Sequence, residues 1–147
     1  MLTSSATIRH LWRETGEIRE ARDLATKYMM SLGFDQDTTG SFCLALGEAV
    51  ANAIVHGDGA KTKLWFGSCA GVAVANFLIW NHFDGTPPDF RYRPLDQLSL
   101  EKESGRGIAL MQNLGGQFTG CVEAELHRVR VTYSVKRVPN LLVAATA

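Results

Sequence analysis

The chain has 147 residues, 46% of them hydrophobic, and its fifteen Lys and Arg residues balance fifteen Asp and Glu residues. This balance, without a marked Lys/Arg cluster, argues against nucleic acid or an anionic membrane surface as a partner. The length and apolar content predict a single domain over residues 1–138 with a C-terminal tail over residues 139–147. No stretch approaches the roughly 20 uninterrupted apolar residues of a membrane span, and the three cysteines form neither a metal pattern nor a disulfide framework. We therefore expect a cytoplasmic protein whose cysteines are small core residues.

The first part of the chain predicts an edge strand followed by two helices. Residues 6–12 alternate in polarity, and apolar residues then recur at three- and four-residue steps until Gly33, which is typical of the end of a helix. Asp37 or Thr38 can cap the next helix. Its segment FCLALGEAVANAIV, residues 42–55, is apolar on nearly every side, so this helix should be buried.

The rest of the chain changes to the two-residue period of strands. Residues 61–68 and 72–82 predict two strands, residues 107–114 a short helix, and residues 117–122 and 127–136 two further strands. Helices on one face of a mixed, mostly antiparallel sheet give an α+β fold, a two-layer α/β sandwich.

The buried helix carries two strongly polar residues, Glu48 and Asn52. They are four residues apart and therefore lie one above the other on the same helix face. Burial of an unpaired carboxylate or carboxamide costs several kcal/mol, about 2–7 for a neutral amide, unless something satisfies it. A carboxylate and an amide oxygen placed in this way can hold a hydrated Mg²⁺ and orient an attacking nucleophile. A structural interpretation stays open, in which Glu48 pairs with an Arg and Asn52 caps a neighbouring loop.

Two later segments add to this pattern. Residues 79–90, IWNHFDGTPPDF, form a strand end that leads into a Gly/Pro turn. In ESGRGIALM, residues 103–111, Gly105 and Gly107 flank Arg106 just before a helix. Glycines at a helix N-terminus let backbone N–H groups approach a phosphate, although this pattern alone is more often just a loop.

Together, over residues 6–136, these segments resemble the GHKL family with the Bergerat-type ATP-binding fold, and within it the anti-sigma-factor serine-protein kinases. LALGEAVANAIVHG is similar to the family's N box, which implies that Glu48 is the catalytic base and that Asn52 ligates Mg²⁺. SGRGIALM resembles its second glycine box, so Gly105, Arg106 and Gly107 would line the phosphates of ATP under a mobile lid, which we expect over residues 91–104.

The segment between these two boxes departs from the family pattern, which has Asp-x-Gly at the strand end with the Asp accepting from the adenine amino group. By strand register Asn81 takes the place of the Asp, and Phe83 then takes the place of the glycine. Counted back from the later Pro-Pro-Asp, Asp84 and Gly85 are the nearest counterparts instead. Asn81 offers an acceptor oxygen without charge, which predicts weakened adenine recognition.

The resemblance implies a serine/threonine-protein kinase that uses ATP and Mg²⁺, regulates a sigma factor and phosphorylates a STAS-like anti-anti-sigma partner. It also implies a partner and homodimer surface on the early helix. The alternative is a non-catalytic regulatory module on the same fold, which has weakened or lost ATP binding and acts by sequestration. The ATPase subdomain of a histidine kinase is disfavoured, because no helical phospho-acceptor domain precedes the sheet in this sequence.

Overall fold

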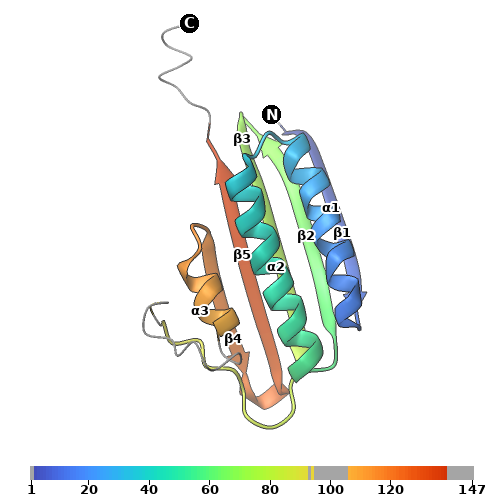
Figure 1. Ribbon diagram of the computed structural model, residues 1–147, viewed down its shortest axis with the longest axis vertical. Helices are drawn as coiled ribbons and strands as arrows, with labels where there is room; N and C mark the ends of the chain where they lie inside the picture. Colours follow the sequence, from blue (N-terminus) through green and yellow to red (C-terminus); the bar gives the residue numbers. More distant parts are fainter. Residues whose placement is uncertain (1, 93, 95–105, 139–147) are drawn as a thin grey trace, which may run out of the picture.

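The computed structural model describes residues 2–92, 94 and 106–138, and these form a five-stranded sheet with three α-helices (Figure 1). In chain order the strands are β1 (Leu2–Trp12), β2 (Ala60–Cys69), β3 (Val72–His82), β4 (Gln117–Glu123) and β5 (Arg128–Arg137). The helices are α1 (Ile18–Ser31), α2 (Gln36–His56) and α3 (Arg106–Asn113). Short 3-10 turns precede α1 (Thr15–Glu17) and β5 (Ala124–Leu126).

The strand order in the sheet is β1-β2-β3-β5-β4. Each of the four pairings is antiparallel, so the described strands form an antiparallel sheet and not a mixed one. Burial alternates along the central strands β2, β3 and β5, because one face of the sheet is covered and the other is not. The expected α+β two-layer sandwich is confirmed.

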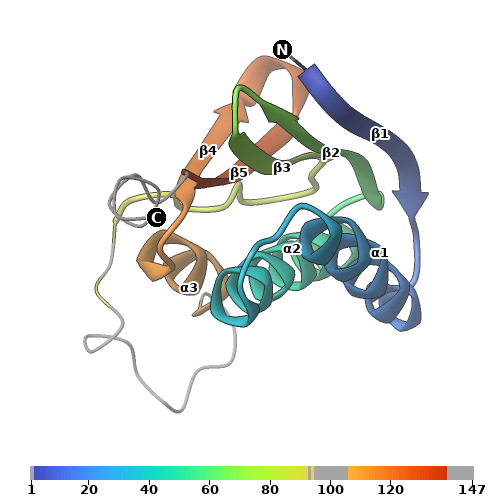
Figure 2. The ribbon, with the colours of Figure 1, turned by 90° about the horizontal axis from the view of Figure 1, so that it is seen from above.

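The three helices lie on the same face of the sheet (Figure 2). The central helix α2 packs against β2, β3 and β5, with α1 on one side of it and α3 on the other. Because α2 is covered on several sides, its sequence is apolar all round. It is long and apolar enough by composition to cross a membrane, and half of that apolar window is buried inside the fold, as in a core helix.

α2 begins earlier than the sequence indicated. Its N-cap is Asp35, whose carboxylate accepts a hydrogen bond of 2.6 Å from the Thr38 N–H. The expected caps at residues 37 and 38 are therefore wrong, and both residues lie in the first turn of the helix. Satisfaction of an otherwise unpaired N–H at the helix start is worth about 1 kcal/mol.

An aromatic cluster joins α2 to the sheet. The ring of Phe42 lies 5.5 Å from that of Phe77 on β3 and 6.0 Å from that of Tyr133 on β5, and all three side chains are buried. Of the three cysteines, Cys43 is buried with this core, but Cys69 and Cys121 are exposed, which corrects the expectation for these two. Cys69 lies at the end of β2, and Cys121 lies on the edge strand β4, where helices cover less of the sheet.

Candidate functional site

The N-terminal end of α3 lies against the face of α2 that carries Glu48 and Asn52. A Cβ atom added at Gly107 would come within 2.7 Å of Glu48 Oε2 and 3.3 Å of Asn52 Nδ2. Only a residue without a side chain allows this approach without displacing the two groups. The fold therefore brings together three predicted site residues from two segments that are more than fifty positions apart in sequence.

Glu48 and Asn52 are partly buried, and neither side chain forms a hydrogen bond or ion pair with any residue that the structure describes. The structural interpretation, an Arg partner for Glu48 and a capped loop for Asn52, is not realised among these residues. His56, one turn further on, is exposed at the end of the helix. With no partner among the described residues, this carboxylate and this amide are available to bind a ligand.

A cavity of about 740 Å³ opens beside this pair. Asn52 lines it, whereas Glu48 is not among its lining residues and sits just beyond it, under Gly107. The other walls come from the end of β3, from β5, from α3 and from residues 84 and 86–91. The volume lies within the range of about 300–1,000 Å³ that is usual for small-molecule sites.

Asn81 lies in the cavity wall and is only 6% exposed. Its Nδ2 donates a hydrogen bond of 3.0 Å to the backbone carbonyl of His82. Since a carbonyl oxygen only accepts, the amide must present its NH₂ group there, and Oδ1 is left as the acceptor. Gly57 makes room for this arrangement, because a Cβ at that position would collide with the Asn81 amide. Asn81 is thus held as a hydrogen-bond acceptor without charge.

The structure separates the two possible counterparts of the family's Asp-x-Gly pair. Asp84 lines the cavity but is exposed at its rim, and Gly85, with φ +74°, lies outside the lining. Phe83 lines the cavity and is 7% exposed, with its backbone N–H donating to His127 O at 2.8 Å. Asn81 and Phe83 are thus the buried pair in the cavity wall, and the Phe83 side chain is part of the core.

Charged groups tie the end of β3 to the turn after α2. Asp58 accepts hydrogen bonds from the His82 backbone N–H at 2.8 Å, and its Oδ2 lies 3.1 Å from His82 Nδ1 and 3.7 Å from Lys61 Nζ. Burial raises the pKa of Asp58, but the hydrogen bonds with His82 and the charge of Lys61 outweigh it and hold the pKa below its ordinary value. This cluster fixes the strand end that carries Asn81.

Two of the three positions predicted to contact phosphate, Gly105 and Arg106, lie at the edge of the described part of the chain. Gly105 lies outside the described residues, as does most of the segment expected to form a lid. Arg106 is described by its backbone alone, as the first residue of α3. Their assignment to the phosphates stays a prediction.

Sequence reasoning missed the wall formed by residues 86–91, together with Gln112 on α3. One signal in the sequence could have found it. Gly120 lies inside β4, and a glycine inside a strand often marks the close approach of another group. Here the Phe90 ring packs on it, so that a Cβ at Gly120 would collide with the ring.

A family model described as histidine kinase-like ATPase domain matches residues 11–118, which include α2, the end of β3 and α3. A search of curated proteins finds no match to the chain.

Proposed function

Because the chain belongs to the histidine kinase-like ATPase domain family, we propose that it is a cytoplasmic, Mg²⁺- and ATP-dependent serine/threonine-protein kinase of the anti-sigma type. The observation that carries the proposal is the placement of Gly107 against Glu48 and Asn52 beside the 740 Å³ cavity. A helix N-terminus with a glycine at its start suits phosphate, because backbone N–H groups point outward and the dipole favours negative charge.

The residues present fit the two ligands. Mg²⁺ is usually bound through one or two protein oxygens together with phosphates and water, so the Asn52 amide oxygen suffices as the protein ligand. Mg²⁺ bound there would neutralise charge on the phosphate oxygens. In the part of the cavity wall formed by the end of β3, the Asn81 Oδ1 acceptor would take the 6-amino group of adenine. The apolar lining, which includes Ile79 and Met111, would contact the base.

We assign Glu48 as the general base that would accept the proton of the attacking hydroxyl. It lies next to Asn52, without a hydrogen-bond or ion-pair partner among the described residues, at the N-terminus of α3. A general base must be within hydrogen-bond reach of the proton that it accepts, and a carboxylate without other partners is available for that task.

Replacement of Asn52 by Ala is expected to weaken the binding of Mg-ATP at least about tenfold, because a charge-assisted or metal contact is worth about 1.5–3 kcal/mol. ATP binding in EDTA should change much less. Isothermal titration calorimetry of the wild type and the variant, with and without Mg²⁺, tests this. Ser41→Ala, on the same helix but outside this cavity, is the control. Equal loss of affinity in both conditions would mean that Asn52 does not act through the metal.

Replacement of Asn81 by Asp restores the family's residue but is expected to destabilise this protein by about 1–3 kcal/mol at neutral pH. The introduced carboxylate would lose the hydrogen bond to His82 O and would face that carbonyl in a buried position. Both effects raise the pKa of the new carboxyl in the folded state above its unfolded value of about 3.9. The deficit therefore appears as pH rises through the raised pKa and disappears as pH falls below the unfolded value.

Urea unfolding between pH 4 and pH 8 measures this dependence. Asn76→Asp, on the uncovered face of the same strand, is the matched control and should show little change. A variant at position 81 that is as stable as the wild type at pH 8 would show that the amide orientation described here is wrong.

One observation favours the non-catalytic alternative. Phe83 occupies, as a buried side chain, the position where the family has a glycine, and this narrows the space at the adenine end of the cavity. On this alternative the protein would bind its partner without nucleotide.

The assignment of the kinase subclass and of its partners is based on the two sequence boxes, LALGEAVANAIVHG and SGRGIALM. The partners that we propose are a sigma factor and a STAS-like anti-anti-sigma protein. Transfer of radiolabelled phosphate from ATP to a purified STAS-like protein tests the reaction. Partner binding by a wild-type protein that binds no nucleotide at millimolar concentration would support the sequestration module instead.

A further inference from the structure

One wall of the cavity consists of a segment without regular secondary structure. Residues 86–91 follow the β3 strand end and line the cavity. A segment of this kind has no helical or sheet hydrogen bonds of its own, so its position depends on what its backbone and side chains contact elsewhere.

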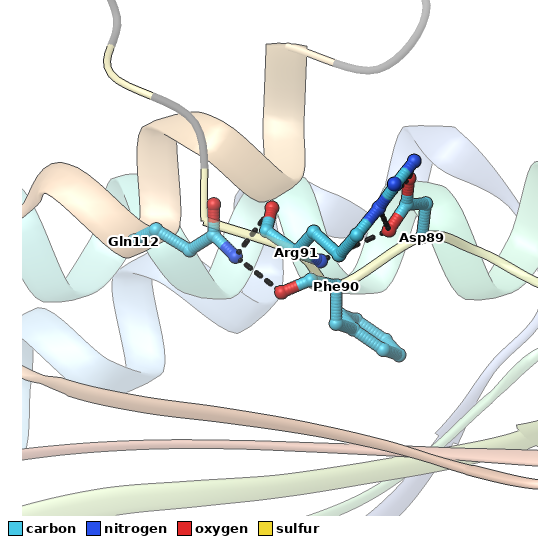
Figure 3. A network of polar contacts seen from close by, with 4 residues as sticks. All are labelled: Asp89, Phe90, Arg91 and Gln112. Atoms are coloured by element: carbon cyan, nitrogen blue, oxygen red, sulfur yellow. Dashed lines mark hydrogen bonds and ion pairs between the residues drawn. The ribbon is translucent and has the colours of Figure 1, made fainter.

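Two elements hold the segment at Phe90. On one side the Phe90 ring packs on Gly120 and lies 6.1 Å from the ring of Phe118, both on β4. On the other side the Gln112 side chain of α3 donates from Nε2 to Phe90 O at 2.8 Å and to Arg91 O at 3.4 Å (Figure 3). Residues 90 and 91 are thus held between the strand β4 and the helix α3.

A local ion pair completes this arrangement. Asp89 accepts hydrogen bonds from the Arg91 backbone N–H at 3.0 Å and from its guanidinium at 2.7–3.1 Å (Figure 3). The Arg91 side chain is 83% exposed, so this pair contributes little to stability by itself. Beside this pair, the carbonyl groups of the two successive residues Phe90 and Arg91 both accept from Gln112.

The same short helix therefore contacts both ends of the candidate site. α3 carries Gly107 at its start, where it lies against Glu48 and Asn52. Near its end it carries Gln112, which contacts the cavity wall formed by residues 86–91. Gln112 also lines the cavity itself. In eight residues, α3 links the proposed phosphate end to a wall of the proposed nucleoside end.

We propose that Gln112 is a positioning residue, which holds residues 89–91 in place as a preformed wall for the nucleoside part of the ligand. This inference rests on the proposed binding of ATP in the cavity. A wall that is already ordered reduces the conformational entropy lost on binding, so its loosening weakens affinity without removing a direct contact. Gln112 acts through main-chain carbonyls and has no part in the chemistry.

Replacement of Gln112 by Met tests the inference, since Met has a similar length but no N–H group. The first measurement uses ligand-free protein. Limited trypsin cleavage after Arg91 should be about tenfold faster in the variant, because loss of two hydrogen bonds increases local opening. Gln117→Met, at an exposed position that does not line this cavity, is the matched control and should be cleaved like the wild type.

The second measurement is calorimetric titration with Mg-ATP and with Mg-tripolyphosphate. The Gln112 variant should bind Mg-ATP about tenfold more weakly and tripolyphosphate equally well, because the altered wall faces the nucleoside. Gly120→Ala, which displaces the Phe90 ring from the opposite side of the segment, should change cleavage and affinity in the same direction. The double variant should lose little beyond either single one.

Cleavage of the Gln112 variant at the wild-type rate would overturn the proposal, whatever the nucleotide result. Faster cleavage with unchanged affinity for Mg-ATP would also overturn it, since the wall would then not belong to the nucleotide site. A wild type that binds no Mg-ATP would refute the proposed function and with it the role of the wall, while the cleavage assay would still show whether Gln112 holds the segment.

Discussion

Replacement of Glu48 by Gln should lower the rate of phosphoryl transfer by ~10²–10⁴-fold and leave the affinity for Mg-ATP nearly unchanged. A general base acts only in the transition state, so its loss lowers kcat and kcat/KM together without changing ground-state binding. Gln has the shape of Glu but cannot accept the proton. Single-turnover transfer of radiolabelled phosphate and calorimetric titration, on the same preparations, measure the two quantities.

The structure also predicts that this replacement leaves the stability of the protein nearly unchanged. The Glu48 side chain has no ion pair or hydrogen bond with the described residues, so the change to Gln breaks no such interaction among them. The midpoint of thermal unfolding should therefore stay within a few degrees of the wild-type value. Glu125→Gln, at an exposed position in the turn before β5, is the control. A large fall in stability, or an unchanged rate of transfer, would contradict the assignment of Glu48 as the base.

The elements of this fold could be predicted from the sequence because each has a clear period. Five strands and three helices were expected, and the structure has them with ends shifted by a few residues. The start of α2 was misplaced because residues 36–41 are polar and small, and several of them can cap a helix. Only the conformation of Asp35, extended with ψ 169°, decides which residue is the cap.

Some residues of the candidate site could be predicted from the sequence, and others could not. Glu48 and Asn52 could be predicted from their spacing on one helix, and Asn81 from the register of its strand. The wall formed by residues 86–91 could not, because its position depends on contacts with Gln112 and Gly120, which lie more than twenty residues away. The orientation of the Asn81 amide likewise depends on a carbonyl and a glycine that spacing alone does not bring together.

Replacement of Gly107 by Ala is expected to have the second large effect on phosphoryl transfer, because α3 approaches α2 closely at this residue. The added Cβ would lie 2.7 Å from Glu48 Oε2, closer than such atoms can approach, and 3.3 Å from Asn52 Nδ2. The flexible end of the Glu48 side chain is the part that can move. We therefore expect the carboxylate to shift by several tenths of an ångström or more, away from the N-terminus of α3.

A misplacement of about 1 Å can cost ~10²-fold in rate, so phosphoryl transfer should fall by about that factor. Stability should change by less than about 1 kcal/mol, because Ala favours the helix over Gly by a similar amount and offsets the crowding. Gly115→Ala is the matched control, since a Cβ there meets nothing within 4 Å. It should keep the wild-type rate.

The double variant that combines Glu48→Gln with Gly107→Ala separates displacement of the base from other causes. If the added methyl acts only by moving the Glu48 carboxylate, it should cost almost nothing further once that carboxylate is replaced by an amide. Single-turnover rates for the wild type, the two single variants and the double variant give this coupling directly. Fully additive losses would show that Gly107 acts on the phosphates or on Asn52 instead, and that the close approach of the two helices does not serve to place the base.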